Sequence, residues 1–406
     1  MMAIQGAQQS QKSLRNYIIE KKLDIEVQYA EYIAKHYTDY KAKRNLYDFI
    51  DMLEFATMSD LDVPTLDYLI IDEAQDLSTL QWTIVNILAS SAEHIIIAGD
   101  DKQTINDFAG ADVDTFLSLP GKVITLERSH RVPKAIYELA NKLTIRMKKY
   151  RKEGSVWQPK KTTDGGSIHI VDDLPIYDML SGTWLVLTRA AYQLEPFKEK
   201  LIELGTMAPL LFTMPDGAAP IDMDILFLAN AIETFQRQIP KGFSFNKLNV
   251  NVEDGLKEQK NKMKYIKLIK KYCADMCQDL NMIDPDLIEA LDNGTKWYKL
   301  FKRVNPQVLE YCKNVFPRYK QDGNNMFKDA PIRLTTIHKA KGTEADNVYV
   351  LLSIPKNPYM SMVSGEDDSE AKVFYVAVTR AKHKLFLGRG PVTSKYSYEY
   401  LLRNSG

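Results

Sequence analysis

Cysteine is scarce in this sequence, and long apolar runs are missing. Cys273, Cys277 and Cys312 are the only thiols, too few for a disulfide-stabilised scaffold and typical of a reducing compartment. Cys273 and Cys277 could share a helix face, but no fourth ligand accompanies the three thiols, which argues against a metal or cluster site. No apolar segment reaches the roughly 18 residues that span a bilayer. No signal sequence opens the chain, so we expect a cytoplasmic protein with no membrane partner.

Net charge is absent as well. Lys plus Arg number 53 and Asp plus Glu number 53, so any nucleic-acid binding must come from local patches and not from a global basic field. The segment 257–271 holds seven lysines and forms a basic stripe, for which a solvated helix face and a contact with a DNA backbone both stay open. At 406 residues the chain is long enough for two to four domains.

A glycine-rich phosphate loop is missing too. The pattern G-x-x-x-x-G-K-[ST] occurs nowhere in the 406 residues. The backbone N–H groups and the lysine of such a loop hold the phosphates of a nucleotide. This absence is the strongest constraint on what the chain does by itself.

The stretch 66–111 organises the sequence. Residues 68–71, YLII, are apolar without alternation, as expected for a parallel strand covered on both faces. Asp72 and Glu73 follow at the carboxyl end, the edge where open α/β sheets bind ligands. A second such strand at 94–98 ends in Gly-Asp-Asp-Lys-Gln. Either acid pair alone could be turn residues that cap a helix, but two such edges favour a site for a metal and a nucleotide.

Strand and helix patterns alternate through the rest of the chain. Residues 122–126 read as a strand, and Arg131 lies just past it, where a guanidinium either is solvated or reaches phosphate oxygens. Further strands are predicted at 332–336 and 348–352. A helix at 373–382 carries Arg380 near its end, where a cation that complements the helix dipole is the ordinary interpretation. This alternation predicts an α/β fold.

Five sequence blocks carry a family resemblance. They are LIIDEAQD, IIIAGDDKQTINDFAGA, LERSHR, TTIHKAKGTEADNVYVL and FYVAVTRAKHKL. In this order they resemble motifs II to VI of superfamily 1A DNA helicases of the UvrD, Rep and PcrA type, and residues 45–53 resemble the helix that precedes motif II. The form GDDKQ favours the 3′ to 5′ branch.

The resemblance implies two RecA-like parallel-sheet domains, the first incomplete, with a helical insertion in the second. The expected boundaries are a partial first RecA-like domain at 1–127, the second RecA-like domain at 128–220 and 331–406, and the insertion at 221–330. In this family ATP and Mg²⁺ bind in the cleft between the domains, and single-stranded DNA crosses their upper surface.

Catalytic roles follow from the same resemblance. Asp72 would hold Mg²⁺, and Glu73 would activate the attacking water. Gln103 would sense the γ-phosphate. Arg131 and Arg380 would neutralise the charge that develops on it, the arginine-finger role.

Further residues match nucleotide-binding positions. Gly342 and Glu344 would lie at the nucleotide, with Glu344 contacting the ribose. His130 stands where the family commonly has a tyrosine that packs on adenine. An imidazole would stack less well there.

DNA contacts are implied for Phe108, Thr336 and His338. Phe108 would stack on a base, a contact worth about 1–3 kcal/mol that tolerates any sequence. The family usually has tryptophan at this position and arginine at Ala109, so the expected platform is smaller and lacks one cation.

Two functions from different classes remain. The first is an ATP-dependent 3′ to 5′ DNA helicase or translocase, present as a fragment or split product, with a separate chain supplying the phosphate loop and single-stranded DNA or a single-strand/duplex junction as partner. The alternative is a non-hydrolysing single-stranded DNA-binding or scaffolding protein that keeps the helicase fold. A third, less favoured interpretation is an arm of a nuclease complex, although no nuclease acid cluster is evident. If the strand before the phosphate loop is missing, the first sheet should expose its edges.

Overall fold

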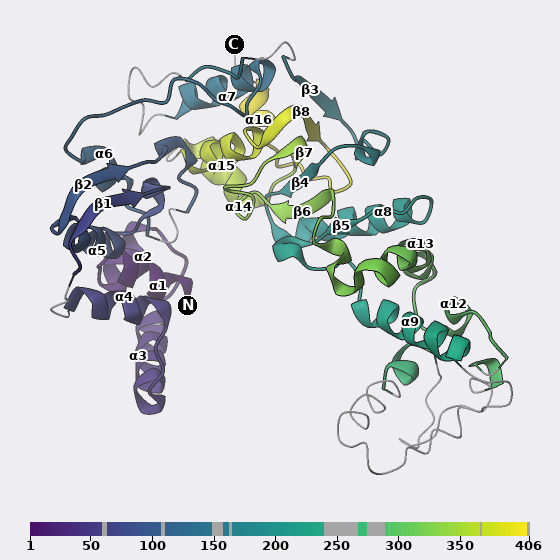
Figure 1. Ribbon diagram of the computed structural model, residues 1–406. Helices are drawn as coiled ribbons and strands as arrows, with labels where there is room; N and C mark the ends of the chain where they lie inside the picture. Colours follow the sequence, from purple (N-terminus) through teal and green to yellow (C-terminus); the bar gives the residue numbers. More distant parts are fainter. Residues whose placement is uncertain are drawn as a thin grey trace. The chain divides into compact units, whose positions relative to one another are not determined.

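The computed structural model has two compact units (Figure 1). Unit 1 consists of Met1–Ser167, Ile354–His383 and Tyr396–Gly406, and unit 2 of Ile168–Ser353 and Lys384–Lys395. The residues that the structure describes are 1–58, 63–106, 110–147, 157–161, 165–238, 267–273, 289–291, 293–365 and 368–403. Among the described helices, none combines the length and the apolar character that a membrane crossing needs.

Unit 1 contains a two-stranded parallel sheet. Strand β1 (Leu66–Ile71) pairs with β2 (Ala92–Ile97), with Tyr68 opposite His94. Helix α5 (Thr79–Ala89) connects them. It begins where the Ser78 hydroxyl accepts from the Gln81 N–H while the Gln81 side chain accepts from the Ser78 N–H, a capping box. Parallel pairing brings the acid-bearing ends of both strands to one edge, as the sequence predicts.

The strand predicted at 122–126 does not form, so that prediction is wrong. The segment has no strand structure, and the side chains of Val123, Ile124 and Leu126 are 84%, 72% and 84% exposed. An apolar, β-branched run becomes a strand only where a neighbour supplies hydrogen bonds and a covered face. Neither is present around this segment in the described part of unit 1.

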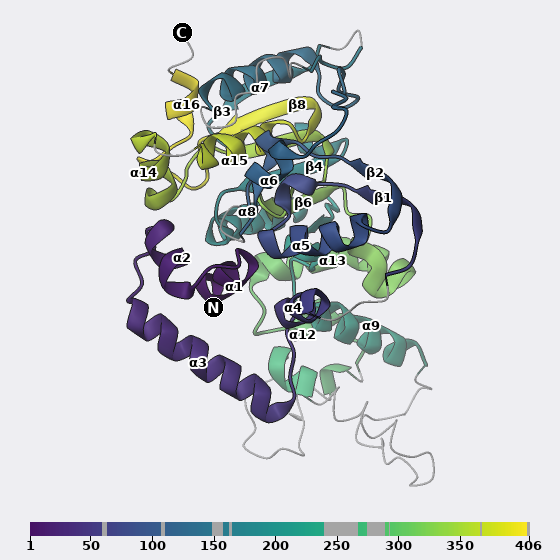
Figure 2. The same cartoon turned by 90° about the vertical axis from the view of Figure 1, so that its left-hand side faces the viewer.

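Helices complete unit 1. They are α1 (Met2–Gln9), α2 (Leu14–Glu20), α3 (Val27–Arg44), α4 (Phe49–Met58), α6 (Val113–Ser118), α7 (Lys134–Arg146), α14 (Lys356–Ser364), α15 (Ser369–Val378) and α16 (Glu399–Arg403). Helix α3 leads from α2 to α4 (Figure 2). Helix α15 is buried along its length from Glu370 to Val378 and packs against α7, α14 and the short 3-10 turn η2 (Asp101–Gln103).

A buried lysine joins α3 to α4. The Lys41 Nζ donates to Asp48 Oδ2 at 2.8 Å and to Asp51 Oδ1 at 2.7 Å, and the side chain of Lys41 is only 10% exposed. The other oxygen of Asp48 accepts from the N–H groups of Ile50 and Asp51, which caps α4. The ion pair thus holds the start of α4.

This network makes the stability of unit 1 pH-dependent. Burial raises the pKa of Asp48, but hydrogen bonds from Lys41, the Asp51 N–H and Tyr37 outweigh it and lower that pKa from 3.8 to about 2. A depressed carboxyl pKa stabilises the fold above pH 3.8 by about 2 kcal/mol. The contribution disappears as the pH falls from about 4 to about 2.

We expect Lys41→Met to remove the part of this contribution that comes from the lysine and to lower the free energy of unfolding at pH 7 by about 1 kcal/mol, because the Asp51 N–H and Tyr37 still bond Asp48. Urea titrations at pH 7 and pH 2.5 measure it, because the two proteins should differ much less at the lower pH. An equal difference at both pH values would contradict the assignment.

Unit 2 is built on a six-stranded sheet. Its order is β3-β8-β7-β4-β6-β5. The strands are β3 (Ser167–Val171), β4 (Trp184–Thr188), β5 (Phe212–Thr213), β6 (Ile332–Thr336), β7 (Ala345–Leu351) and β8 (Ala381–Gly388). Strand β4 pairs in parallel with β6 and β7, and β5 with β6. Every residue of β4 is buried, as the unalternating apolar run WLVLT requires.

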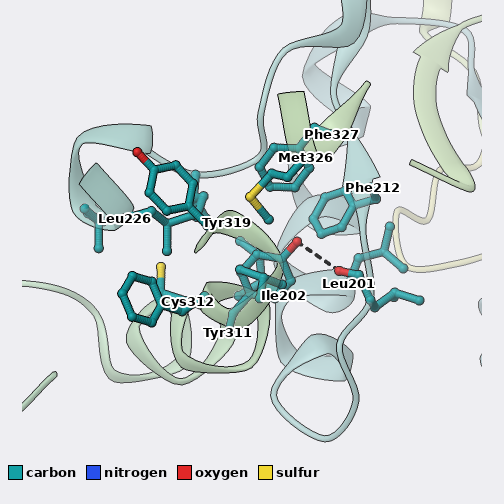
Figure 3. Packing of buried hydrophobic residues seen from close by; sticks show 14 of the residues in the cluster. Leu201, Ile202, Phe212, Leu226, Tyr311, Cys312, Tyr319, Met326 and Phe327 are labelled. Atoms are coloured by element: carbon teal, nitrogen blue, oxygen red, sulfur yellow. Dashed lines mark hydrogen bonds between the residues drawn. The ribbon is translucent and has the colours of Figure 1, made fainter. Parts of the chain in front are cut away.

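One hydrophobic core is shared by this sheet and by four helices that lie between its strands in the sequence. They are α8 (Glu195–Gly205), α9 (Met223–Gln238), α12 (Trp297–Leu300) and α13 (Pro306–Asp322). Figure 3 shows side chains from α8, β5, α9 and α13 packed together, among them Leu201, Phe212, Leu226 and Tyr311. The helical pattern predicted from residue 221 is therefore present in the described residues and shares the core of the sheet. Much of the lysine-rich segment 257–271 lies outside the described residues.

Tyr311 contributes a buried hydrogen bond to this core. Its hydroxyl donates to the Leu210 carbonyl at 3.0 Å (the dashed line in Figure 3), and the residue is fully buried. We expect Tyr311→Phe to leave that carbonyl unsatisfied and to lower the free energy of unfolding by about 1–3 kcal/mol. Guanidinium titration measures the change. Tyr177→Phe, at an 89% exposed position of the same unit, is the control, and an equal effect of both would contradict this role.

Candidate active site

Two acids extend from the end of β1. Asp72 Oδ1 accepts from the Glu73 N–H at 2.8 Å, and Glu73 itself has a left-handed backbone, with φ of 52°. Beyond the ladder, the Ala98 N–H donates to the Ile71 carbonyl and the Ala74 N–H to the Ala98 carbonyl. These bonds keep the ends of β1 and β2 together, and both acid side chains are exposed at that edge.

Gln75 connects the two strand ends, a role that the sequence did not reveal. It is fully buried. Its Nε2 donates to Glu73 Oε2 at 2.5 Å, and its Oε1 accepts from the Asp100 N–H at 2.9 Å. A Cβ atom at Gly99 would lie 2.6 Å from this Oε1 and 2.8 Å from the ring of Phe116, so any other residue there would have to displace the Gln75 amide and that ring. The sequence places Gln75 two residues after Glu73, but its second partner, Asp100, lies beyond the end of the other strand, β2.

Gln103 is held from both sides. Asp100 caps η2 through Oδ1, which accepts from the Lys102 N–H, while its Oδ2 accepts from Gln103 Nε2 at 2.8 Å. The carbonyl oxygen of the Gln103 side chain then accepts from Arg380 Nη2 at 2.9 Å. These two bonds fix the orientation of the Gln103 amide. The amide thereby links Asp100, at the edge of the sheet that carries the acids, to Arg380.

Arg380 lies just beyond α15 and is 1% exposed. Its Nε donates to the Val376 carbonyl at 2.9 Å, and its Nη2 also donates to Thr379 Oγ1 at 3.2 Å. The first bond satisfies a carbonyl at the helix end, as the ordinary interpretation of this cation predicts. The bond to Gln103 shows that the same guanidinium also faces the acid edge.

Opposing charges surround this arginine. Burial and the charge of Arg131 lower the pKa of Arg380 from 12.5 to about 10, while Tyr375, Glu73 and Asp100 act in the other direction. The guanidinium stays protonated at neutral pH. Two arginines and two carboxylates thus interact within unit 1, and such a cluster of perturbed ionisable groups is typical of functional sites.

Most of the catalytic residues predicted from sequence come together here. Glu73, Gln103, Arg131 and Arg380 form one cluster, Asp72 adjoins it, and His130 is exposed in the turn before Arg131. In unit 2, Thr336 ends β6, His338 follows it, and Gly342, with φ of 76°, and Glu344 form the exposed turn before β7. The Glu344 carbonyl accepts from Arg333. Phe108 lies outside the described residues.

Comparison with known proteins matches both ends of the chain to helicase domains. Residues 2–123 match the UvrD/REP helicase N-terminal domain, and residues 331–387 match the UvrD-like helicase C-terminal domain. These two matches support the assignment of both regions to the UvrD/PcrA-like helicase family.

Individual UvrD/Rep-like relatives are distant. The ATP-dependent DNA helicase PcrA of Staphylococcus aureus is 23% identical over 408 residues, covering 79% of this chain and 54% of the relative. PcrA of Staphylococcus epidermidis is 29% identical over 147 residues, with 33% and 20% covered, and the ATP-dependent DNA helicase Rep of Buchnera aphidicola is 28% identical over 125 residues, with 28% and 19% covered. The chain therefore spans about half the length of the PcrA protein that it matches most extensively among these.

The acid edge of this UvrD/Rep-like chain suits Mg²⁺ only together with a nucleotide. No group of three or more His, Cys, Asp or Glu side chains in the described residues could hold a metal ion. Mg²⁺ in phosphate-transfer sites is typically bound by one or two carboxylates, with phosphate oxygens and water completing the shell. The exposed carboxylate of Asp72 fits that requirement.

Proposed function

We propose that this chain contributes the acids and the arginines of an ATP-driven translocase that moves along single-stranded DNA from 3′ to 5′. One observation carries the proposal. A continuous line of hydrogen bonds runs from Glu73 through Gln75, Asp100 and Gln103 to the buried Arg380. It places a carboxylate that can accept a proton and a cation that can stabilise a phosphoryl group in one preorganised site.

Each residue then has a defined task. Glu73 accepts the proton of the water that attacks the γ-phosphate. Arg131 and Arg380 stabilise the negative charge that grows on the transferred group. Gln103, fixed by its hydrogen bonds to Asp100 and Arg380, senses the γ-phosphate and holds Arg380 toward it. Asp72 would hold Mg²⁺, which when bound neutralises phosphate charge.

Nucleoside and DNA contacts complete the proposal. His130, Gly342 and Glu344 bind the base and ribose, and Thr336, His338 and Phe108 contact the DNA strand. The two family matches and the positions of these residues in the family's motifs support these roles.

The phosphate loop comes from polypeptide beyond the 406 residues in this proposal. Acids and arginines without a loop bind a triphosphate weakly, because the backbone N–H groups of the loop supply most phosphate contacts. In this proposal the segment G-x-x-x-x-G-K-[ST] comes either from another part of a longer protein or from a separate polypeptide.

The test is DNA-stimulated ATP hydrolysis by the chain alone and mixed with such a polypeptide. We expect turnover only in the mixture, and a lysine-to-alanine change in the added loop should abolish it. No turnover under either condition would overturn the proposal.

A second function is favoured by the missing loop itself, namely binding single-stranded DNA without hydrolysis. DNA affinity that is unchanged by ATP and by Glu73→Gln would support this alternative. Affinity that changes several-fold with ATP in the mixture would exclude it.

A further inference from the structure

In unit 2, the carboxyl ends of β4 and β6 lie side by side (Figure 1). Thr188, the last residue of β4, pairs with Thr336, the last residue of β6, and the Ile337 N–H donates to the Thr188 carbonyl at 2.9 Å. The chain leaves the two strands through two segments, 189–194 after β4 and 337–341 after β6. We call these strand ends and the two segments the β4–β6 edge.

Tyr192 is an exposed aromatic residue at the β4–β6 edge. It lies in the short 3-10 helix η5 (Ala191–Leu194), which contacts both β4 and β6, and it is 68% exposed. No described residue forms a hydrogen bond with its hydroxyl or a ring contact with its face. A single exposed aromatic side chain is ordinary by itself, so the support beneath Tyr192 and the charges around it decide what it does.

Buried hydrogen bonds support the backbone at Tyr192. The next residue, Gln193, is 1% exposed. Its Oε1 accepts from the Ala190 N–H, and its Nε2 donates to the Ser353 carbonyl, both at 2.9 Å. The Ala190 carbonyl accepts from the Thr188 hydroxyl at 3.0 Å and from the Gln193 N–H at 3.1 Å. The turn is thus fixed before a ligand arrives, so a ligand that binds Tyr192 has to order only its side chain.

The segments of the β4–β6 edge carry positive charge. Arg189 follows β4 and Lys339 and Lys341 follow β6, and neither segment contains Asp or Glu. Asp216, in the turn η6 (Pro215–Gly217), pairs with Lys339 from outside the two segments, but the side chains of this pair are 51% and 74% exposed. Exposed ion pairs are weak, so a phosphate can replace Asp216. An exposed ring among cations suits a polymer of bases and phosphates.

We propose that Tyr192 is a DNA-binding residue, whose ring stacks on a base of single-stranded DNA at the β4–β6 edge. The proposal rests on the proposed function for its ligand and deepens it, because Thr336 and His338 contact the strand only from the β6 side. Tyr192 adds a contact from the β4 side. Stacking accepts any base, which suits a protein that moves along DNA.

Two variants of Tyr192 test the ring. Dissociation constants are measured with the full chain by fluorescence anisotropy of end-labelled oligothymidine. Tyr192→Ala should weaken binding about tenfold, because stacking on one base is lost. Tyr192→Phe should stay within about twofold of the wild type, since its ring still stacks. Tyr177→Ala is the matched control, because Tyr177 is 89% exposed in the same unit but precedes β4, and it should bind like the wild type.

An abasic strand of the same length separates stacking from charge. It keeps the phosphates and lacks the bases, so Tyr192→Ala and the wild type should bind it equally. The slope of the logarithm of affinity against the logarithm of salt concentration should also be the same for both proteins, because no phosphate contact is lost. An equal loss of affinity for both strands, or a shallower salt slope in Tyr192→Ala, would overturn the inference.

The outcomes for Tyr192 and for the proposed function can be told apart. If the wild type binds oligothymidine and Tyr192→Ala binds it equally well, the inference fails and the proposed function stands. If Tyr192→Ala weakens binding as expected but the mixture with the loop-bearing polypeptide does not hydrolyse ATP, the inference stands and the proposed function fails. No binding of single-stranded DNA by the wild-type chain, alone or in the mixture, would overturn both.

Discussion

Replacing Arg380 with alanine in the reconstituted mixture is expected to lower the kcat of DNA-stimulated ATP hydrolysis by about a thousandfold to a hundred-thousandfold, the range that arginine fingers contribute. The guanidinium is buried and already oriented by Gln103 and Val376, so it reaches the developing charge without reorganisation. Steady-state kinetics at saturating DNA measure the effect. A loss below about tenfold would contradict the assignment of Arg380 to the site.

Two variants make this result specific. Arg380→Lys keeps the charge but loses the planar fork that bonds two acceptors at once, so most of the activity should still be lost. Arg403→Ala removes an arginine whose side chain is 76% exposed and paired with Glu399 on α16, and it should leave kcat unchanged. Equal losses in Arg380→Ala and Arg403→Ala would point to a general effect on folding.

The isolated chain is expected to associate with itself at micromolar concentration through the sheet of unit 1. Tyr68 and Ile70 on one face of β1 are 60% and 68% exposed, and the consecutive residues Ile95 and Ile96 of β2 are 46% and 51% exposed. Because consecutive strand residues point to opposite faces, both faces of β2 present apolar surface. Parallel sheets are normally covered on both faces, and exposed strand edges promote pairing between chains.

Ile70→Glu combined with Ile96→Glu should weaken this association about a hundredfold or more, since each buried isoleucine contributes about 2 kcal/mol. Sedimentation velocity across a concentration series measures it, and the loop-bearing polypeptide should suppress association of the wild-type chain. Tyr177→Glu, at an exposed site of unit 2, is the control. A monodisperse wild-type monomer that unfolds cooperatively would refute the expectation.

The site illustrates how far local sequence patterns reach. Motifs in the sequence predicted the site residues one by one: the acids after β1 and β2, Arg131 and Arg380. The structure brings Glu73, Gln103 and both arginines together. The domain boundaries and the catalytic roles of these residues stay predictions. The role of Gln75 was not predicted, because it bonds Asp100, a partner that no spacing rule connects to it.

The sequence by itself determined the parallel strands of the site, the acids at their carboxyl ends and the resemblance to UvrD-like helicases, because apolar runs and short motifs are local properties of the chain. Tertiary structure alone decided that 122–126 is not a strand, since a strand depends on neighbours that the segment itself does not contain. It also decided that Arg380 bonds Gln103, a contact across 277 positions of sequence. Such a contact depends on how α15 packs against η2, and the packing of two distant elements is encoded by the whole buried surface and not by either motif.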